Sequence, residues 1–143
     1  MTNRMNIAGA AAFIASAMTI SALPAGAQVA HAAEETILTE GEAKLARLLD
    51  GRVAGTPQNC IPSNRIRDFE SIDRTALVYE IGDTIYVNYT RIPETIDDDD
   101  LVLSRQFGTR LCRLDNVTTH NRSNNLYSGN LFLTEFIPYR RAD

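Results

Sequence analysis

The segment TALVYEIGDTIYVNYT, residues 75–90, constrains the fold more than any other stretch of the chain. Two β-rich runs of alternating residues flank Gly82-Asp83, which suits a type II′ turn with glycine at its first central position. This turn pairs Tyr79 with Tyr86 across the hairpin. Both faces are then largely apolar, so we expect both to be at least partly covered, with the rings used for packing rather than for stacking on a ligand. One face carries Ala76, Val78, Ile85, Val87 and Tyr89, and the other carries Leu77, Tyr79, Ile81 and Tyr86.

An amphipathic helix is predicted upstream of this hairpin, at residues 40–50. Thr39 is placed to cap it, and Glu42 three residues later completes a capping box. The Gly- and Pro-containing stretch GRVAGTPQN, residues 51–59, indicates a linker. The helix carries one apolar stripe at the spacing i, i+3, i+4, formed by Leu45, Leu48 and Leu49.

Four further segments have the composition of β-strands. They lie at residues 64–72, 101–107, 110–120 and 130–139. Short strands separated by frequent turn signals are typical of an antiparallel sheet, a sandwich or a small barrel. The sequence therefore predicts a single α+β domain over residues 39–141, with the helix at its N-terminal end. Its β-rich part, residues 60–139, is expected to form a small, mostly antiparallel sheet or partly open barrel of about 5–6 strands.

The first 27 residues have the pattern of an export signal peptide. Arg4 precedes an uncharged apolar run at residues 7–23, and an A-x-A cleavage site ends at Ala27, with a second one ending at Ala32. The alternative is an uncleaved membrane anchor. The run is rich in alanine and shorter than the roughly 20 strongly apolar residues that a spanning helix needs, which favours cleavage. A flexible segment is then expected at residues 28–38, and the protein is expected to be periplasmic or secreted, with no stable membrane anchor.

The chain contains two cysteines, Cys60 and Cys112. In an exported protein an even number of cysteines favours a disulfide, and two cysteines allow only one pairing. The alternative is a pair of buried free thiols. The spacing matches no zinc pattern, because there is no C-x-x-C pair and the only histidines are His31 and His120.

Four consecutive aspartates occupy positions 97–100, between a proline turn and an apolar run. A calcium loop of EF-hand type needs alternating acids, a glycine at position 6 and a glutamate at position 12. Counted from Asp97, positions 5, 6 and 12 are Leu101, Val102 and Gly108, so the template fails. Adjacent side chains of an extended segment also point in different directions. We therefore expect an exposed loop without an obligatory ion. Asp97 and Asp99 remain as weak candidates for a metal contact.

His120 lies in a polar stretch that resembles a turn. A hydrolase would need an acid to orient this histidine and a nucleophile beside it, and Asp115 and Ser123 are near in sequence. No motif such as G-x-S-x-G accompanies them. We therefore assign no catalytic residue and expect an exposed loop histidine.

The segment from residue 51 to residue 88, together with RLCRLD and EFIPYRR further on, resembles a family of short exported alphaproteobacterial proteins, of the sphingomonad group especially. That family is a domain of unknown function. The resemblance covers residues 44–141 and is carried by three elements, Cys60-Ile61, Leu111 to Arg113, and Phe136 to Pro138.

More distant members of this family have two further cysteines, one near Ile92 and one near Leu131, and this chain has neither. The resemblance therefore implies one lost bridge, with Cys60 and Cys112 as the retained pair. It implies no catalytic residue.

The net charge of the chain and the motifs it contains reduce the number of possible function classes. The formal net charge is −4, and removal of the signal removes Arg4 and no acid, which gives −5. A mildly acidic chain with scattered arginines is a poor partner for nucleic acid. No cofactor motif is present. The sequence favours a non-enzymatic envelope or binding module, for which an envelope protein is the candidate partner. The alternatives are a small periplasmic hydrolase and a weak metal-binding or sensing protein.

Overall fold

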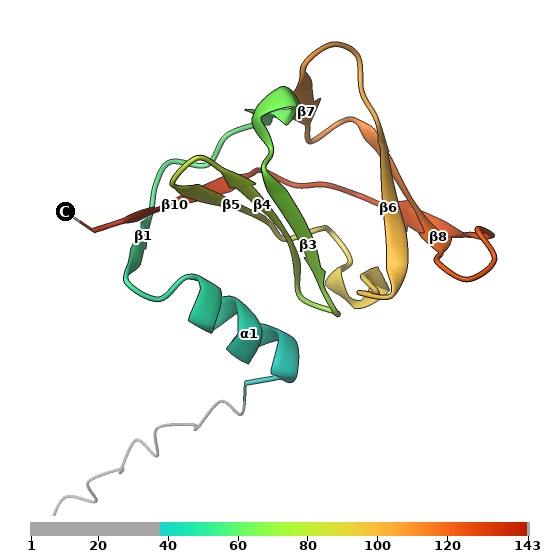
Figure 1. The fold of residues 1–143 in the computed structure, drawn as a ribbon, viewed down its shortest axis with the longest axis horizontal. Coiled ribbons are helices and arrows are strands. Elements are labelled where there is room, and N and C mark those ends of the chain that lie inside the picture. The colour runs from blue at the N-terminus through green and yellow to red at the C-terminus, as the bar shows by residue number, and fades with distance from the viewer. Residues whose placement is uncertain (1–37, 143) are drawn as a thin grey trace, which may run out of the picture. The chain divides into compact units, whose positions relative to one another are not determined.

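The computed structural model describes residues 38–142 (Figure 1). The expected signal peptide, and all but the last residue of the expected flexible segment 28–38, lie outside the described residues. The described part has the α+β character that the sequence predicts, with one helix and mostly antiparallel β-structure. Its ten strands form three sheets rather than one, and they do not close into a barrel.

The helix α1 (Glu40–Leu48) begins as the sequence predicts. The Thr39 side chain accepts a hydrogen bond from the Glu42 N–H at 3.2 Å, and the Glu42 carboxylate accepts one from the Thr39 N–H at 2.8 Å. Each of these two backbone N–H groups, which would otherwise lack a partner, thus gains a side-chain acceptor. The helix ends at Leu48, two residues before its predicted end, and Gly51 follows with a φ of 68°.

The largest sheet has five strands in the order β1-β10-β5-β4-β3. Its centre is the predicted hairpin: Tyr79 pairs with Tyr86, and Gly82 has a φ of 60° while Asp83 keeps a negative φ, as a type II′ turn requires. One strand, β1, lies within the predicted linker 51–59, so that prediction was wrong in part. The strands are β1 (Arg52–Ala54), β3 (Asp68–Ile72), β4 (Ala76–Ile81), β5 (Thr84–Asn88) and β10 (Ile137–Arg141).

The other two sheets hold the remaining strands. β6 (Asp100–Arg105), β8 (Asn116–Asn121) and β9 (Tyr127–Leu131) form a three-stranded sheet in the order β6-β8-β9. β2 (Cys60–Pro62) and β7 (Arg110–Cys112) form a two-stranded ribbon.

The strand number exceeds the predicted 5–6 because two of the predicted strands are each interrupted. Residues 110–120 contain a turn in which the Asp115 N–H bonds to the Cys112 carbonyl, and residues 130–139 leave one sheet at Leu131 and enter another at Ile137.

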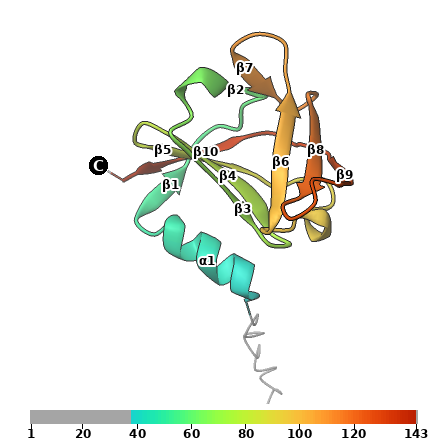
Figure 2. The ribbon, with the colours of Figure 1, turned by 45° about the vertical axis from the view of Figure 1, so that its right-hand side comes forward.

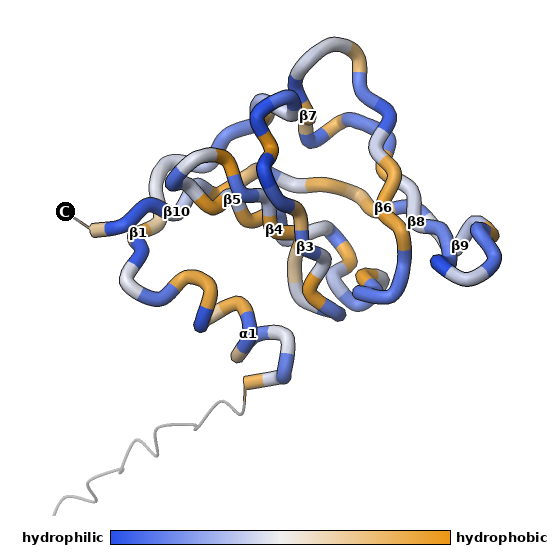
Figure 3. The backbone as a smooth tube through the Cα atoms, viewed as in Figure 1, coloured by the Kyte–Doolittle hydropathy of each residue, from blue (hydrophilic) through white to orange (hydrophobic). Residues whose placement is uncertain are grey.

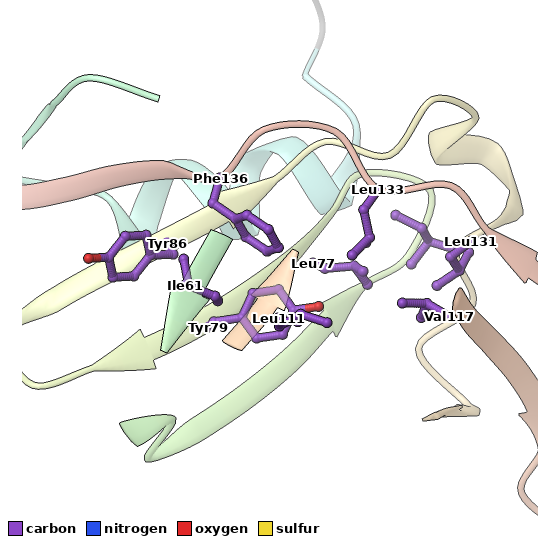
Figure 4. Packing of buried hydrophobic residues seen from close by; sticks show 10 residues of the cluster. Ile61, Leu77, Tyr79, Tyr86, Leu111, Val117, Leu131, Leu133 and Phe136 are labelled. Atoms are coloured by element: carbon purple, nitrogen blue, oxygen red, sulfur yellow. The ribbon is translucent and has the colours of Figure 1, made fainter. Parts of the chain in front are cut away.

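Both faces of the hairpin are buried, as expected. The helix covers one face, and the three-stranded sheet and the ribbon lie over the other, so the hairpin is the middle layer (Figures 1 and 2). In Figure 3 the apolar stretches of β4 and β5 lie at this centre. The helix-side core consists of Leu45, Ile72, Ala76, Val78, Ile85 and Val87. The larger core, shown in Figure 4, consists of Ile61, Leu77, Tyr79, Tyr86, Ile96, Leu111, Val117, Leu131, Leu133 and Phe136.

Cys60 and Cys112 form the predicted disulfide. They are paired residues at the same rung of the β2–β7 ribbon, with their Cα atoms 4.0 Å apart.

The two positions at which distant relatives have further cysteines also lie close together. The Arg91 N–H donates to the Phe132 carbonyl oxygen at 2.9 Å. The segments near Ile92 and Leu131 therefore lie side by side, as a second bridge between these positions would need.

Candidate functional site

The three-stranded sheet presents one face to solvent. Its register aligns Leu101 with His120 and Tyr127 in one row, and Leu103 with Thr118 in the next. Because side chains alternate along a strand, these residues share one side of the sheet. We call this surface the outer face; it consists of Leu101, Leu103, Arg105, Asn116, Thr118, His120, Tyr127 and Asn130.

The outer face is uncovered and carries three large, exposed apolar side chains among polar ones, whereas the opposite side of the same strands is largely buried. Leu103 and Tyr127 keep 48% and 58% of their surface exposed, while Val117 and Thr119, on the same strand β8, keep 1% and 3%. Figure 2 shows these three strands side by side, on the opposite side of the five-stranded sheet from α1. Exposed apolar side chains grouped on one sheet face and surrounded by polar residues mark a candidate protein interaction surface.

His120 belongs to this face and not to a loop, so the loop prediction was wrong. It pairs within β8 and is half-buried against Tyr127, with ring centroids 5.9 Å apart in an edge-to-face arrangement. Its Nδ1 lies 3.2 Å from the Asn125 carbonyl oxygen, to which it donates when that nitrogen carries the proton.

The groups that a hydrolase would need do not meet at His120. The Asp115 carboxylate accepts a hydrogen bond from the Cys112 N–H at 2.7 Å, at the opposite end of β8 and about 15 Å along the strand from His120. The Ser123 hydroxyl bonds to the Asn121 side chain. None of the hollows described below is lined by His120.

Carboxylates gather where the aspartate run meets another turn. One carboxylate oxygen each from Asp73, Asp97 and Asp98 lie within 4.8 Å of one another, and all three residues are exposed. Asp73 comes from the turn between β3 and β4, which the Arg74 N–H joins to the Ile96 carbonyl at 3.0 Å. The weak candidate Asp97 therefore belongs to a three-carboxylate group, and the weak candidate Asp99 does not.

Asp100 departs from the expected exposed loop. Asp97, Asp98 and Asp99 are exposed, but Asp100 begins β6 and keeps only 9% of its surface exposed. Its alternation with Leu101 turns it to the inner side of the sheet, together with Val102. It lines a hollow of about 580 Å³ with Asp73 and Asp97 and a second of about 390 Å³ with Asp98.

Two exposed arginines mark a basic region elsewhere on the surface. Arg91 and Arg113 both line a hollow of about 350 Å³ beside Phe132 and another of about 450 Å³ beside Glu135. In residues 38–142 neither guanidinium takes part in an ion pair. Asp115 lines the first hollow and Glu135 the second, so two acids balance the two positive charges.

A further hollow of about 510 Å³ lies along α1, beside Leu45, Tyr89 and Pro93. Burial, followed by a hydrogen bond with Tyr139, raises the pKa of Tyr89 to about 12. Tyr89 is therefore a neutral phenol at physiological pH. It offers a hydrogen bond to a ligand but no charge.

Sequence reasoning missed Asp73 and the outer face. Asp73 lies in the β3–β4 turn, which the fold brings beside the aspartate run, and nothing in the local sequence pattern shows that these two segments meet. The outer face had a partial signal, because Leu101 and Leu103 alternate with Val102 and Ser104 in the predicted strand 101–107. The partner strands could not be assigned from that alternation.

Comparisons of the chain with family models, with curated proteins and with solved structures find no match. In the part of the chain that the structure describes, no helix is long and apolar enough to cross a membrane.

Proposed function

We propose that the protein is an exported, non-enzymatic binding module of the bacterial envelope, periplasmic or secreted, and that its outer face docks a protein partner. The observation that carries this proposal is the uncovered outer face, on which Leu101, Leu103 and Tyr127 are exposed. A disulfide is consistent with an oxidising, non-cytoplasmic compartment. The expected signal peptide supports export.

The composition of the outer face favours a protein as the occupant. Its central strand β8 contributes Thr118 and His120, and the apolar side chains lie on either side of them, on the edge strands β6 and β9. Arg105 and two asparagines complete the face. It contains no aspartate, glutamate or lysine, although the chain as a whole has 18 acidic residues. Protein interfaces have this composition: aromatic and arginine residues are enriched in them, and lysine, aspartate and glutamate are depleted.

The edge strands of the three-stranded sheet offer a second means of contact with a partner. Among the described strands, β6 and β9 each pair on one side only, with β8. Their open edges offer unpaired backbone groups to an extended segment of a partner. Leu101 and Leu103 on β6, together with Tyr127 on β9, lie at these edges and are the expected anchors of binding.

Crosslinking and affinity capture of the tagged protein from envelope extracts test the proposal. We expect Leu103→Ala and Tyr127→Ala to weaken capture of the partner on the order of tenfold, as truncation of interface anchors does. Phe107→Ala is the matched control, because Phe107 is fully exposed but lies outside the outer face. The proposal would be contradicted if both outer-face variants captured the partner as well as the unsubstituted protein does. It would also be contradicted if Phe107→Ala alone abolished capture.

A further inference from the structure

Strand β6 has one open edge. Among the described strands it pairs only with β8, so the other side of its backbone has no strand partner. An exposed edge that carries apolar side chains is a template for pairing with another chain. All residues of β6 after Asp100 are at least half-exposed, namely Leu101, Val102, Leu103, Ser104 and Arg105.

The β6–β8 ladder shows which backbone groups point to this edge. In an antiparallel pair, alternate residues bond to the neighbouring strand, and the residues between them point away from it. The Asp100 N–H makes a long bond of 3.4 Å to the Asp97 carbonyl oxygen, away from β8. Its partner Asn121 donates to the Leu126 carbonyl oxygen at 2.8 Å, on the β9 side, so these two partners do not bond to each other. The residues that point to the open edge are therefore Asp100, Val102 and Ser104.

One antiparallel register pairs all three of these edge residues with the same three residues of a second β6. It places Val102 opposite Val102 of the second copy, and Asp100 opposite Ser104. A shift of two residues in either direction leaves one of the three outside the ladder. The backbone alone therefore selects the register that is centred on Val102.

The side chains are complementary in the register that the backbone selects. Leu101 of each copy lies opposite Leu103 of the other, so two exposed leucines cover each other at each of two places. Asp99, one residue before the strand, lies opposite Arg105 at the end of the other strand. Both residues are exposed, and in residues 38–142 neither takes part in an ion pair. Opposite charges therefore meet at both ends of the ladder, and apolar side chains meet between them.

We propose that the β6 edge pairs with the β6 edge of a second copy of this chain, as a symmetric antiparallel ladder. The two three-stranded sheets would join into one sheet in the order β9-β8-β6-β6-β8-β9. A twofold interface of this kind closes on itself, so two copies satisfy it without open-ended growth. The other open edge of the sheet, β9, has the sequence YSGNL and carries no charge that could match either end of β6. The inference rests on the proposed use of the β6 edge in binding, and it names the occupant of that edge.

Analytical ultracentrifugation of the mature, disulfide-bonded protein in about 50 mM salt tests this proposal. We expect a reversible equilibrium between monomer and dimer with a dissociation constant of about 10 μM, because a short ladder buries little area. Asp99→Arg and Arg105→Asp each place like charges at both ends of the ladder, so each should weaken self-association on the order of tenfold. Both residues are exposed, so the substitutions leave the fold intact, which circular dichroism verifies.

An equimolar mixture of these two variants restores the opposite charges at both ends of a mixed dimer. We expect the mixture to associate as the unsubstituted protein does. Tyr127→Ala is the matched control, because Tyr127 belongs to the outer face but lies on β9, and it should leave self-association unchanged.

Three results would overturn the proposal. They are a protein that is monomeric at about 200 μM, self-association that both charge variants leave unchanged, and a mixture of the two variants that does not associate. None of these results bears on capture of an envelope partner through Tyr127. Conversely, a protein that dimerises as expected, but whose capture of an envelope partner does not depend on the outer face, would contradict only the proposed function.

Discussion

Asn88 links the central hairpin to the segment between β9 and β10. Its side chain is fully buried, its Nδ2 donates to the Thr134 carbonyl oxygen at 2.9 Å, and its Oδ1 accepts from the Thr134 N–H at 3.1 Å. One amide side chain thus satisfies both backbone groups of a residue 46 positions away. Where a segment leaves its sheet, as residues 132–136 do, such a side chain replaces the missing ladder partner.

Asn88→Ala removes both of these hydrogen bonds and leaves two backbone groups unpaired. A buried unsatisfied group costs about 1–3 kcal/mol. Thr134 is half-buried, so water reaches part of it, and we take the lower half of that range for each group. The expected loss in the free energy of unfolding is about 2–4 kcal/mol, a large share of the roughly 5–15 kcal/mol typical of a domain.

Urea unfolding followed by far-ultraviolet circular dichroism measures this loss, since the chain has no tryptophan. Asn130→Ala is the control, because Asn130 is exposed on β9, and it should change stability by less than about 0.5 kcal/mol. Asn88→Asp keeps the acceptor but places a carboxylate against the Thr134 carbonyl oxygen, so at neutral pH it should destabilise more than Asn88→Ala. A loss below about 1 kcal/mol for Asn88→Ala would refute the reasoning.

Three further outcomes are expected. Unfolded but unreduced protein should contain no free thiol, and replacing Cys60 and Cys112 together with serine should lower the free energy of unfolding by about 4 kcal/mol, from loop entropy at a sequence separation of 52; two labelled thiols per chain would contradict this. Hydrogen bonds from Thr39 lower the pKa of Glu42, so its contribution is complete above its ordinary pKa of 4.5 and is lost as pH falls through the lowered value. Glu42→Gln should therefore reduce the fall in Tm between about pH 6 and pH 3, and an unchanged fall would contradict the assignment. Intact-mass measurement of protein from the native envelope should show cleavage after Ala27, or otherwise after Ala32, and a mass that retains residues 1–23 would mean that the segment is an uncleaved anchor.

Local rules account for the elements that the sequence predicted well. The Gly82-Asp83 turn fixes its own register, because only two residues separate its strands, and the capping box joins Thr39 to a residue three positions away. The disulfide could be predicted for a different reason, since two cysteines allow only one pairing.

Long-range pairing explains what the sequence did not reveal. β1 has only three residues and becomes a strand because β10, about 85 positions later, pairs with it. The break between β9 and β10 is likewise not marked in the sequence, because residues 131–137 contain no glycine or proline that would signal it. Phe136 lies in that break and is fully buried, as Leu131 and Leu133 are, although in one continuous strand it would face the opposite side from them.

The aspartate run shows the same limit at the scale of single side chains. The four residues look alike in sequence, but the first three occupy a turn while Asp100 is drawn into the β6–β8 ladder, where it pairs with Asn121. Pairing with a distant strand therefore decides which carboxylate is buried. It also decides that Asp73, rather than the adjacent Asp99, completes the carboxylate group.

The disulfide and the outer face are mechanically connected. A two-stranded ribbon is at best marginally stable alone, and the bond between Cys60 and Cys112 closes β2 and β7 at one rung. From Cys112 the chain passes through a tight turn, held by the Asp115 carboxylate on the Cys112 N–H, directly into β8. β8 is the central strand of the outer face and pairs with both β6 and β9. The disulfide therefore fixes the position at which β8 begins, and β8 is the strand on which the proposed docking surface is built. Because the disulfide forms in an oxidising compartment, such a compartment would favour both the fold and the surface.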